Sequence, residues 1–251
     1  MDLWGQFNIS EYEPVRRPLG EVRLALRMER GELIVTVDTP ASASAPWASG
    51  VQEERWTAPG PAASVTIEPA LPDRPIVIGV TNPFRIAPGA EVRLQVQVPV
   101  WARIHLEDPA RTLLAEVAST VLSPTWWGGK TRGELAYWLP ARVEHTDAEV
   151  GPATAATAVC LLRVTNRSRS VLDVTRLAIR APLHTLFATE RGLVTDEAKI
   201  LYTGEDSTEI DVGARPPSFA PHAPNVQRPR QFAARGLKAL TFAHLRSLEL
   251  Y

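Results

Sequence analysis

"GEVRLALRMERGELIVTVD", residues 20–38, decides the fold class because apolar residues occupy every second position on both sides of Gly31. Arg23 and Arg27 fall between them and point to the opposite side. Strict alternation of this kind is typical of half-buried strands, and the glycine between the two runs marks a turn. The stretch therefore predicts a β-hairpin whose inward positions are Val22, Leu24, Leu26, Leu33, Val35 and Val37.

The same two-residue period returns along most of the chain, over residues 76–117, 157–179 and 186–212. It predicts an all-β protein made of two β-sandwich-like units packed together, with a short C-terminal helix. We expect a first unit at 1–122 with a Pro/Ala/Ser-rich excursion at 39–64, a second unit at 123–212, and a Pro-rich linker followed by an amphipathic helix at 213–251.

The terminal segment carries apolar residues at helical spacing, which favours a helix that docks a partner protein. The alternation around Leu240 and Phe242 leaves a strand open as the other interpretation. The residues on the helical stripe are Leu237, Leu240, His244, Leu245 and Leu248.

Two apolar strands end in the same tripeptide, at Val80–Asn82 and Val164–Asn166, and each is followed by a turn. The repetition is consistent with a duplicated β-sandwich. "VTN" also arises wherever a strand enters an Asx turn, so chance similarity stays open.

Composition argues against several classes of function. The 251-residue chain has a formal net charge of −1, which gives no overall field for nucleic acid. No apolar run is long enough for a transmembrane segment, and the first residues lack the basic start of a signal peptide, so we expect a cytoplasmic protein. The single cysteine, Cys160, lies in an apolar strand and is expected to be a buried, inert thiol.

The chain lacks the familiar motifs for catalysis, metal binding and cofactor binding. "GGKT" lacks the first glycine of a phosphate-binding loop, because Pro124 stands at that position. The acidic run around Glu144 favours a solvated turn over a cation site. No G-x-S-x-G elbow occurs. We therefore expect no catalytic residue, no metal and no cofactor.

Residues 125–144 hold three tryptophans and three glycines, and they predict either a buried corner or an exposed aromatic platform that docks a partner. The leading hypothesis is a non-catalytic binding or accessory module that acts through protein–protein contacts. The alternative is a carbohydrate-binding or carbohydrate-active β-sandwich in which tryptophans stack on sugar rings. The candidate binding residues are Trp126, Trp127, Gly133, Glu134, Tyr137, Trp138 and Arg142.

A family resemblance rests on short motifs at the start and in the middle of the chain. The residues that carry it are Trp4, Gly5, Trp127, Gly128, Gly133, Glu134, Leu135, Tyr137 and Arg142. With them the chain resembles the uncharacterised prokaryotic family called domain of unknown function 432. The resemblance implies no established activity. The resemblance implies a membrane channel-type protein as partner, because members of this family are often encoded near small mechanosensitive-type channels. Independently of the resemblance, a homo-oligomer is left open.

Overall fold

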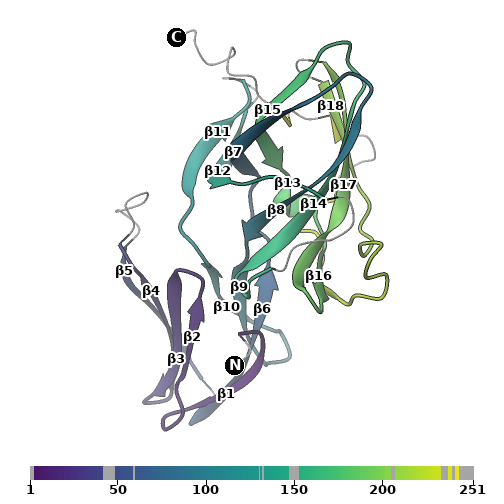
Figure 1. Cartoon of the computed structure of the whole chain (residues 1–251). Helices are drawn as coiled ribbons and strands as arrows, with labels where there is room; N and C mark the ends of the chain where they lie inside the picture. The colour runs from purple at the N-terminus through teal and green to yellow at the C-terminus, as the bar shows by residue number, and fades with distance from the viewer. Residues whose placement is uncertain are drawn as a thin grey trace. The chain divides into compact units, whose positions relative to one another are not determined.

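The prediction of an all-β fold is confirmed by the computed structural model (Figure 1). The structure describes residues 3–41, 49–58, 60–129, 131, 133–146, 153–204, 207–232, 237–238 and 241–242. Across these ranges the chain forms strands and one short 3-10 helix, η2 (Ala181–Leu183). No helix in the described ranges is long and apolar enough to cross a membrane.

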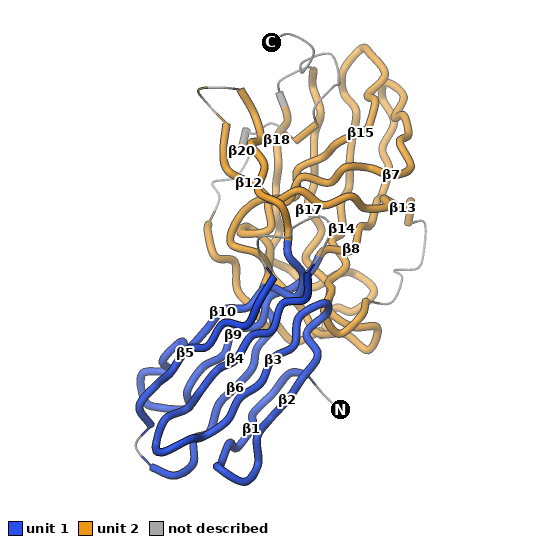
Figure 2. The backbone as a smooth tube through the Cα atoms, turned by 90° about the vertical axis from the view of Figure 1, so that its left-hand side faces the viewer, with its two compact units in different colours: residues 1–70, 99–121 blue, residues 71–98, 122–251 orange. Residues whose placement is uncertain are grey.

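The chain divides into two compact units, shown in blue and orange in Figure 2. Unit 1 contains residues 1–70 and 99–121, and unit 2 contains residues 71–98 and 122–251. The alternation pattern predicted residues 71–98 as part of the first unit. The structure differs because strands formed by these residues pair with strands that come after residue 122.

Unit 1 consists of two four-stranded antiparallel sheets. The first, in spatial order, is β1 (Gly5–Ser10), β6 (Ala62–Ala70), β9 (Trp101–Leu106) and β10 (Leu113–Ala118). The second is β2 (Val15–Leu19), β3 (Val22–Glu29), β4 (Glu32–Thr39) and β5 (Gly50–Thr57). Strand β5 lies within the 39–64 excursion and pairs with β4 along its whole length.

The predicted hairpin of residues 20–38 is confirmed as β3 and β4. Arg30 and Gly31 form its turn with φ of 53° and 82°, the left-handed geometry of a two-residue hairpin loop. Leu26 and Leu33 of this hairpin are almost fully buried in one core with Ile67 of the other sheet. Because both sheets contribute to that core, unit 1 is a β-sandwich.

Unit 2 also contains two sheets. The smaller one, in spatial order, is β11 (Ser123–Trp127), β12 (Glu134–Ala141), β7 (Ile76–Ile86) and β15 (Leu172–Ile179). The larger one has the spatial order β13 (Glu144–His145), β8 (Glu91–Pro99), β14 (Thr157–Asn166), β17 (Gly192–Gly204), β16 (Leu186–Thr189) and β19 (Asn225–Gln227). Two further strands extend it: β18 (Ser207–Val212) pairs with β17, and β20 (Leu237–Lys238) pairs with β18. Two of the pairs are parallel, β12 with β7 and β14 with β17.

The two "VTN" tripeptides both lie in unit 2, on β7 and β14. Asn82 exchanges two hydrogen bonds with the backbone of Val143, and Asn166 accepts from the backbone and hydroxyl of Ser168 in an Asx turn. The tripeptides therefore do not mark one unit each.

The helix predicted at the C-terminus is wrong at the residues that the structure describes there. Leu237 lies in β20, opposite Ile210 of β18, and Phe242 forms an antiparallel bridge with Leu177. The Phe242 ring is buried against Tyr202, with ring centroids 5.9 Å apart. Pairing with existing strand edges satisfies the backbone here, which outweighs the helical spacing. Leu240, His244, Leu245 and Leu248 lie outside the described residues.

Candidate functional site

The tryptophan-rich segment forms the hairpin β11–β12 at one edge of the smaller sheet in unit 2. Trp126 lies opposite Leu135, whereas Trp127 lies opposite Glu134. Residues that face each other across a pair share a side, and neighbours along a strand alternate. Trp126 and Tyr137 therefore project from one face, while Trp127, Glu134 and Trp138 project from the other. The predicted residues do not form one site.

Trp127 and Trp138 belong to a small apolar cluster. Trp127 is 5% exposed and packs with Val77 and Ala178, and Trp138 lies partly buried against the same group. The guanidinium carbon of Arg176 lies 5.3 Å from the centre of a Trp138 ring, a cation–π contact. On this face the tryptophans stabilise the sheet and are covered by their neighbours.

Glu134 is held by an ion pair with Arg180, which lies on the segment between β15 and η2. The Arg180 side chain is mostly buried. The contact joins β12 to the end of β15, so Glu134 has a structural role in this sheet.

Trp126 is the exposed tryptophan of the segment, at 54%, and its opposite neighbour Leu135 is 45% exposed. The indole nitrogen donates to the carbonyl of Gly129 at 3.1 Å. The ring also lies so close to Gly133 that a side chain on residue 133 would collide with it. The ring is therefore fixed in place while one part of it faces solvent.

Tyr137 and Arg142 have separate surroundings. The Tyr137 hydroxyl donates to Asp73 at 2.9 Å, and Arg74 lies over the ring at 5.6 Å. Burial, followed by the bond to Asp73, raises the pKa of Tyr137 to about 12. Arg142 is an exposed side chain whose partner is Glu144, at 3.4 Å.

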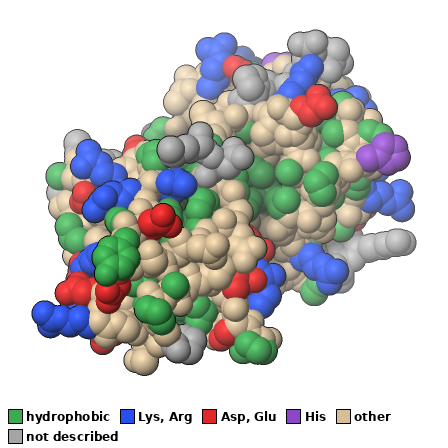
Figure 3. Space-filling view, turned by 90° about the horizontal axis from the view of Figure 1, so that it is seen from below, with side chains coloured by type: hydrophobic (Ala, Val, Ile, Leu, Met, Phe, Trp, Pro, Cys, Tyr) green, Lys and Arg blue, Asp and Glu red, His purple; other side chains and the backbone are tan. Residues whose placement is uncertain are grey.

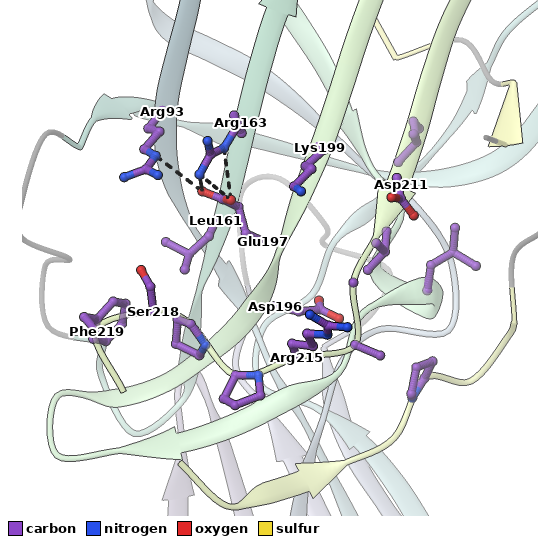
Figure 4. Close-up of a pocket in the computed structure, with 18 of the residues that line it drawn as sticks. Arg93, Leu161, Arg163, Asp196, Glu197, Lys199, Asp211, Arg215, Ser218 and Phe219 are labelled. Atoms are coloured by element: carbon purple, nitrogen blue, oxygen red, sulfur yellow. Dashed lines mark hydrogen bonds and ion pairs between the residues drawn. The ribbon is translucent and has the colours of Figure 1, made fainter. Parts of the chain in front are cut away.

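A pocket of about 830 Å³ opens on the other sheet of unit 2, and none of the candidate binding residues predicted from the sequence lines it (Figure 4). It forms where β17 changes its partner: β17 pairs with β16 as far as Thr195 and with β18 from Ala198 onward. Asp196 and Glu197 lie between these two paired stretches, and both line the pocket. Residues 213–219 of the Pro-rich segment, which leave β18, form its wall.

Charged side chains line the pocket floor and wall, as Figure 4 shows. Glu197 accepts from Arg163 at 2.9 Å and lies 3.7 Å from Arg93, so one carboxylate is shared by two guanidinium groups. Lys199 and Arg215 are exposed, and neither forms an ion pair in the part of the chain that the structure describes. The pocket therefore offers two cations to a ligand.

A pair of buried polar side chains lies beneath the pocket. His184 Nδ1 lies 2.6 Å from Asp196 Oδ1, both side chains are 1% exposed, and the other oxygen of Asp196 accepts from the Thr185 amide at 3.3 Å. Cys160 lies close to Asp196, and its expected burial is confirmed. Burial raises the pKa of its thiol to about 12, which lowers the share of reactive thiolate. In the described residues no group of three His, Cys, Asp or Glu side chains is placed to hold a metal ion.

Comparison with protein families decides the relationship that the motifs indicated. The sequence profile of the family described as "Protein of unknown function (DUF432)" matches residues 3–246. The chain belongs to the DUF432 family. Searches of curated protein sequences and of solved structures gave no match.

The residues that carried the DUF432 resemblance in unit 2 have identifiable structural roles. Gly128 has a φ of 106°, a left-handed conformation that favours glycine. Gly133 makes room for the Trp126 ring, Glu134 pairs with Arg180, and Tyr137 bonds to Asp73. In this DUF432 chain the motif therefore maintains the β11–β12 hairpin, and the pocket is built from other residues.

Proposed function

We propose that this DUF432 chain is a non-catalytic binding module that acts through protein–protein contacts, with the pocket of unit 2 as its docking site. The observation that carries the proposal is the combination of cations in the pocket with aromatic side chains at its margin. Phe219 and Phe232, which both line the pocket, are 44% and 90% exposed. Arginine and aromatic residues are enriched among the residues that dominate binding energy in protein interfaces.

The distribution of charge supports a specific contact over general adhesion. Figure 3 shows acidic and basic side chains interspersed on the face seen there, in keeping with the net charge of −1. A local group of cations inside a pocket can then select one partner segment, because no wide field of one sign competes with it.

The partner that fits the family resemblance is a membrane channel-type protein. The proposal places the chain in the cytoplasm as an accessory to such a channel, where it would bind a segment exposed to that compartment. Binding in a pocket of this volume buries a short stretch of chain, so we expect a reversible complex.

Site-specific photo-crosslinking tests the proposal. A benzoyl-phenylalanine placed at residue 219 should crosslink to the channel-type protein when both are produced together, and mass spectrometry should identify the adduct. The same group at Tyr12, which is 92% exposed in unit 1, is the matched control and should give no adduct. Equal crosslinking from both positions, or from neither, would argue against the docking site.

Sugar binding is the second candidate, and the fixed, exposed ring of Trp126 favours it. Trp138 and Glu134 cannot assist, because they project from the opposite face. A glycan array separates the two functions: specific binding that is lost in Trp126→Ala and kept in Trp138→Ala would support the sugar hypothesis.

A further inference from the structure

We propose that Lys199 and Arg215 form a carboxylate-binding subsite, so that the partner segment received by the pocket is an acidic peptide. The inference rests on the proposed function and specifies the chemistry of the ligand. It begins from the difference between the four cations that line the pocket, Arg93, Arg163, Lys199 and Arg215.

Two of the four cations are already neutralised. Arg163 contacts Glu197 and also lies 3.4 Å from Glu91, and Arg93 lies near the same Glu197. The Arg163 side chain is only 27% exposed, so this pair forms a fixed floor. Because Arg93 and Arg163 already pair with carboxylates of the protein, these two arginines shape the pocket and add little affinity for an anion.

The other two cations come from different elements and face the same space. Lys199 lies on β17, beside Arg163 in the parallel pair with β14, and Arg215 lies on the wall segment that follows β18 (Figure 4). A carboxylate between them would receive charge-assisted hydrogen bonds from both, and those bonds are shorter and stronger than neutral ones.

The acids of the pocket restrict which anion can enter. Asp211 lies opposite Lys199 in the β17–β18 pair and also lines the pocket. A phosphate chain or an anionic lipid surface would bring several negative charges near this carboxylate, and like charges repel. A single carboxylate on a peptide carries one negative charge and meets less repulsion.

The apolar lining points to a peptide as the carrier of that carboxylate. Leu161 lies on the floor, Pro216 and Pro217 on the wall, and Phe219 and Phe232 at the margin. These side chains can contact the neighbours of an acidic residue within the same short segment. The expected ligand is thus a peptide with one Asp or Glu between apolar residues.

Peptide selection tests the inference without knowledge of the natural partner. A random peptide library is selected on the full chain, and enriched peptides are measured by calorimetry. We expect an Asp or Glu at one fixed position, and replacement by Asn or Gln should weaken binding about tenfold. The Lys199→Ala/Arg215→Ala double variant should lose a similar factor, whereas Arg169→Ala, at an exposed arginine elsewhere in unit 2, should change binding less than about twofold.

Charge reversal gives the sharpest outcome. Selection on the Lys199→Glu/Arg215→Glu variant should enrich Lys or Arg at the position that held the acid. The inference is overturned if no peptide is enriched, if the enriched peptides carry no acid, or if the double alanine variant binds them unchanged. Binding of inorganic phosphate or phosphatidylglycerol vesicles that displaces the peptides at equal affinity would also overturn it. If the channel-type protein binds the double alanine and double glutamate variants as tightly as it binds the parent chain, this inference is wrong and the proposed function still stands.

Discussion

The indole ring of Trp138 lies directly against the backbone of Gly79 on the neighbouring strand β7, where a Cβ atom would overlap the ring. The guanidinium group of Arg176 lies over a ring of the same indole, so the Trp138 side chain has little room to move. The contact explains why a strand with a bulky residue at position 138 pairs with a strand that carries a glycine.

Gly79→Ala should therefore destabilise unit 2 by about 1–3 kcal/mol, because the added methyl group forces the Trp138 ring away from its cluster. Urea unfolding followed by tryptophan fluorescence measures the loss. Gly213→Ala is the control, since a Cβ there meets no atom within 4 Å, and it should stay within about 0.5 kcal/mol of the parent. Similar values for the two variants would contradict the packing described for Trp138.

Trp126 and Trp127 are adjacent in sequence, but their replacement by alanine should destabilise the protein to different extents. Trp127→Ala removes a buried ring and should cost about 3–5 kcal/mol. Trp126→Ala removes a ring that is half exposed and should cost about 1 kcal/mol or less. Thermal unfolding of both variants, with acrylamide quenching to confirm which indole is accessible, checks the assignment; a larger loss at Trp126 would refute it.

Two polar side-chain pairs of the same length allow a test of the effect of burial on stability. The nitrogen–oxygen distance is 2.6 Å in both His184–Asp196 and Arg85–Asp173. Both side chains of the first pair are 1% exposed, whereas Arg85 is 78% and Asp173 49% exposed. Asp196→Ala leaves a buried imidazole without its partner and should cost about 3–5 kcal/mol. Asp173→Ala should cost about 0–1 kcal/mol. Chemical denaturation compares them, and equal losses would show that burial does not govern the effect.

The raised pKa of Tyr137 leads us to expect a loss of stability at alkaline pH. Its pKa is raised from 10.0 to about 12 by burial and by the bond to Asp73. Between these two values the unfolded chain releases the phenolic proton while the folded chain keeps it, so the free energy of unfolding falls as pH rises from about 10 to about 12. Below pH 10 the group contributes no pH dependence. Melting temperatures recorded across this range should fall more steeply for the parent than for Tyr137→Phe, and parallel curves would count against the shifted pKa.

Alternation of side chains was enough to predict the fold class, because a hairpin such as residues 22–37 contains its own pairing partner. The helix predicted for the terminal segment is wrong at Leu237 and Phe242 for the opposite reason. Leu237 and Phe242 lie in strands or bridges whose partners, Ile210 and Leu177, are distant in sequence, and tertiary pairing of this kind overrides a local helical period.

The tryptophan-rich segment shows how far composition can lead toward a site. The sequence shows that Trp126 and Trp138 are near one another along the chain, and strand parity then places them on opposite faces. The pocket gave no local signal, because Arg163 and Lys199 become neighbours only through the parallel pairing of β14 with β17. A search for outward-facing cations on strands that could pair in parallel would have found them.

Residues 71–98 of unit 2 are inserted between two paired strands of unit 1, and the rest of unit 2 follows residue 121. Residue 70 ends β6, residue 101 begins β9, and the two lie directly opposite each other in the antiparallel pair. Excising the intervening residues and joining Ala70 to Trp101 through an Asn-Gly dipeptide would close that pair with a standard two-residue loop. The resulting chain, ending at residue 121, would carry both sheets of the smaller sandwich without orphaned strands, whereas a simple truncation after residue 122 would retain β7 and β8 with their hydrogen-bonding edges bare.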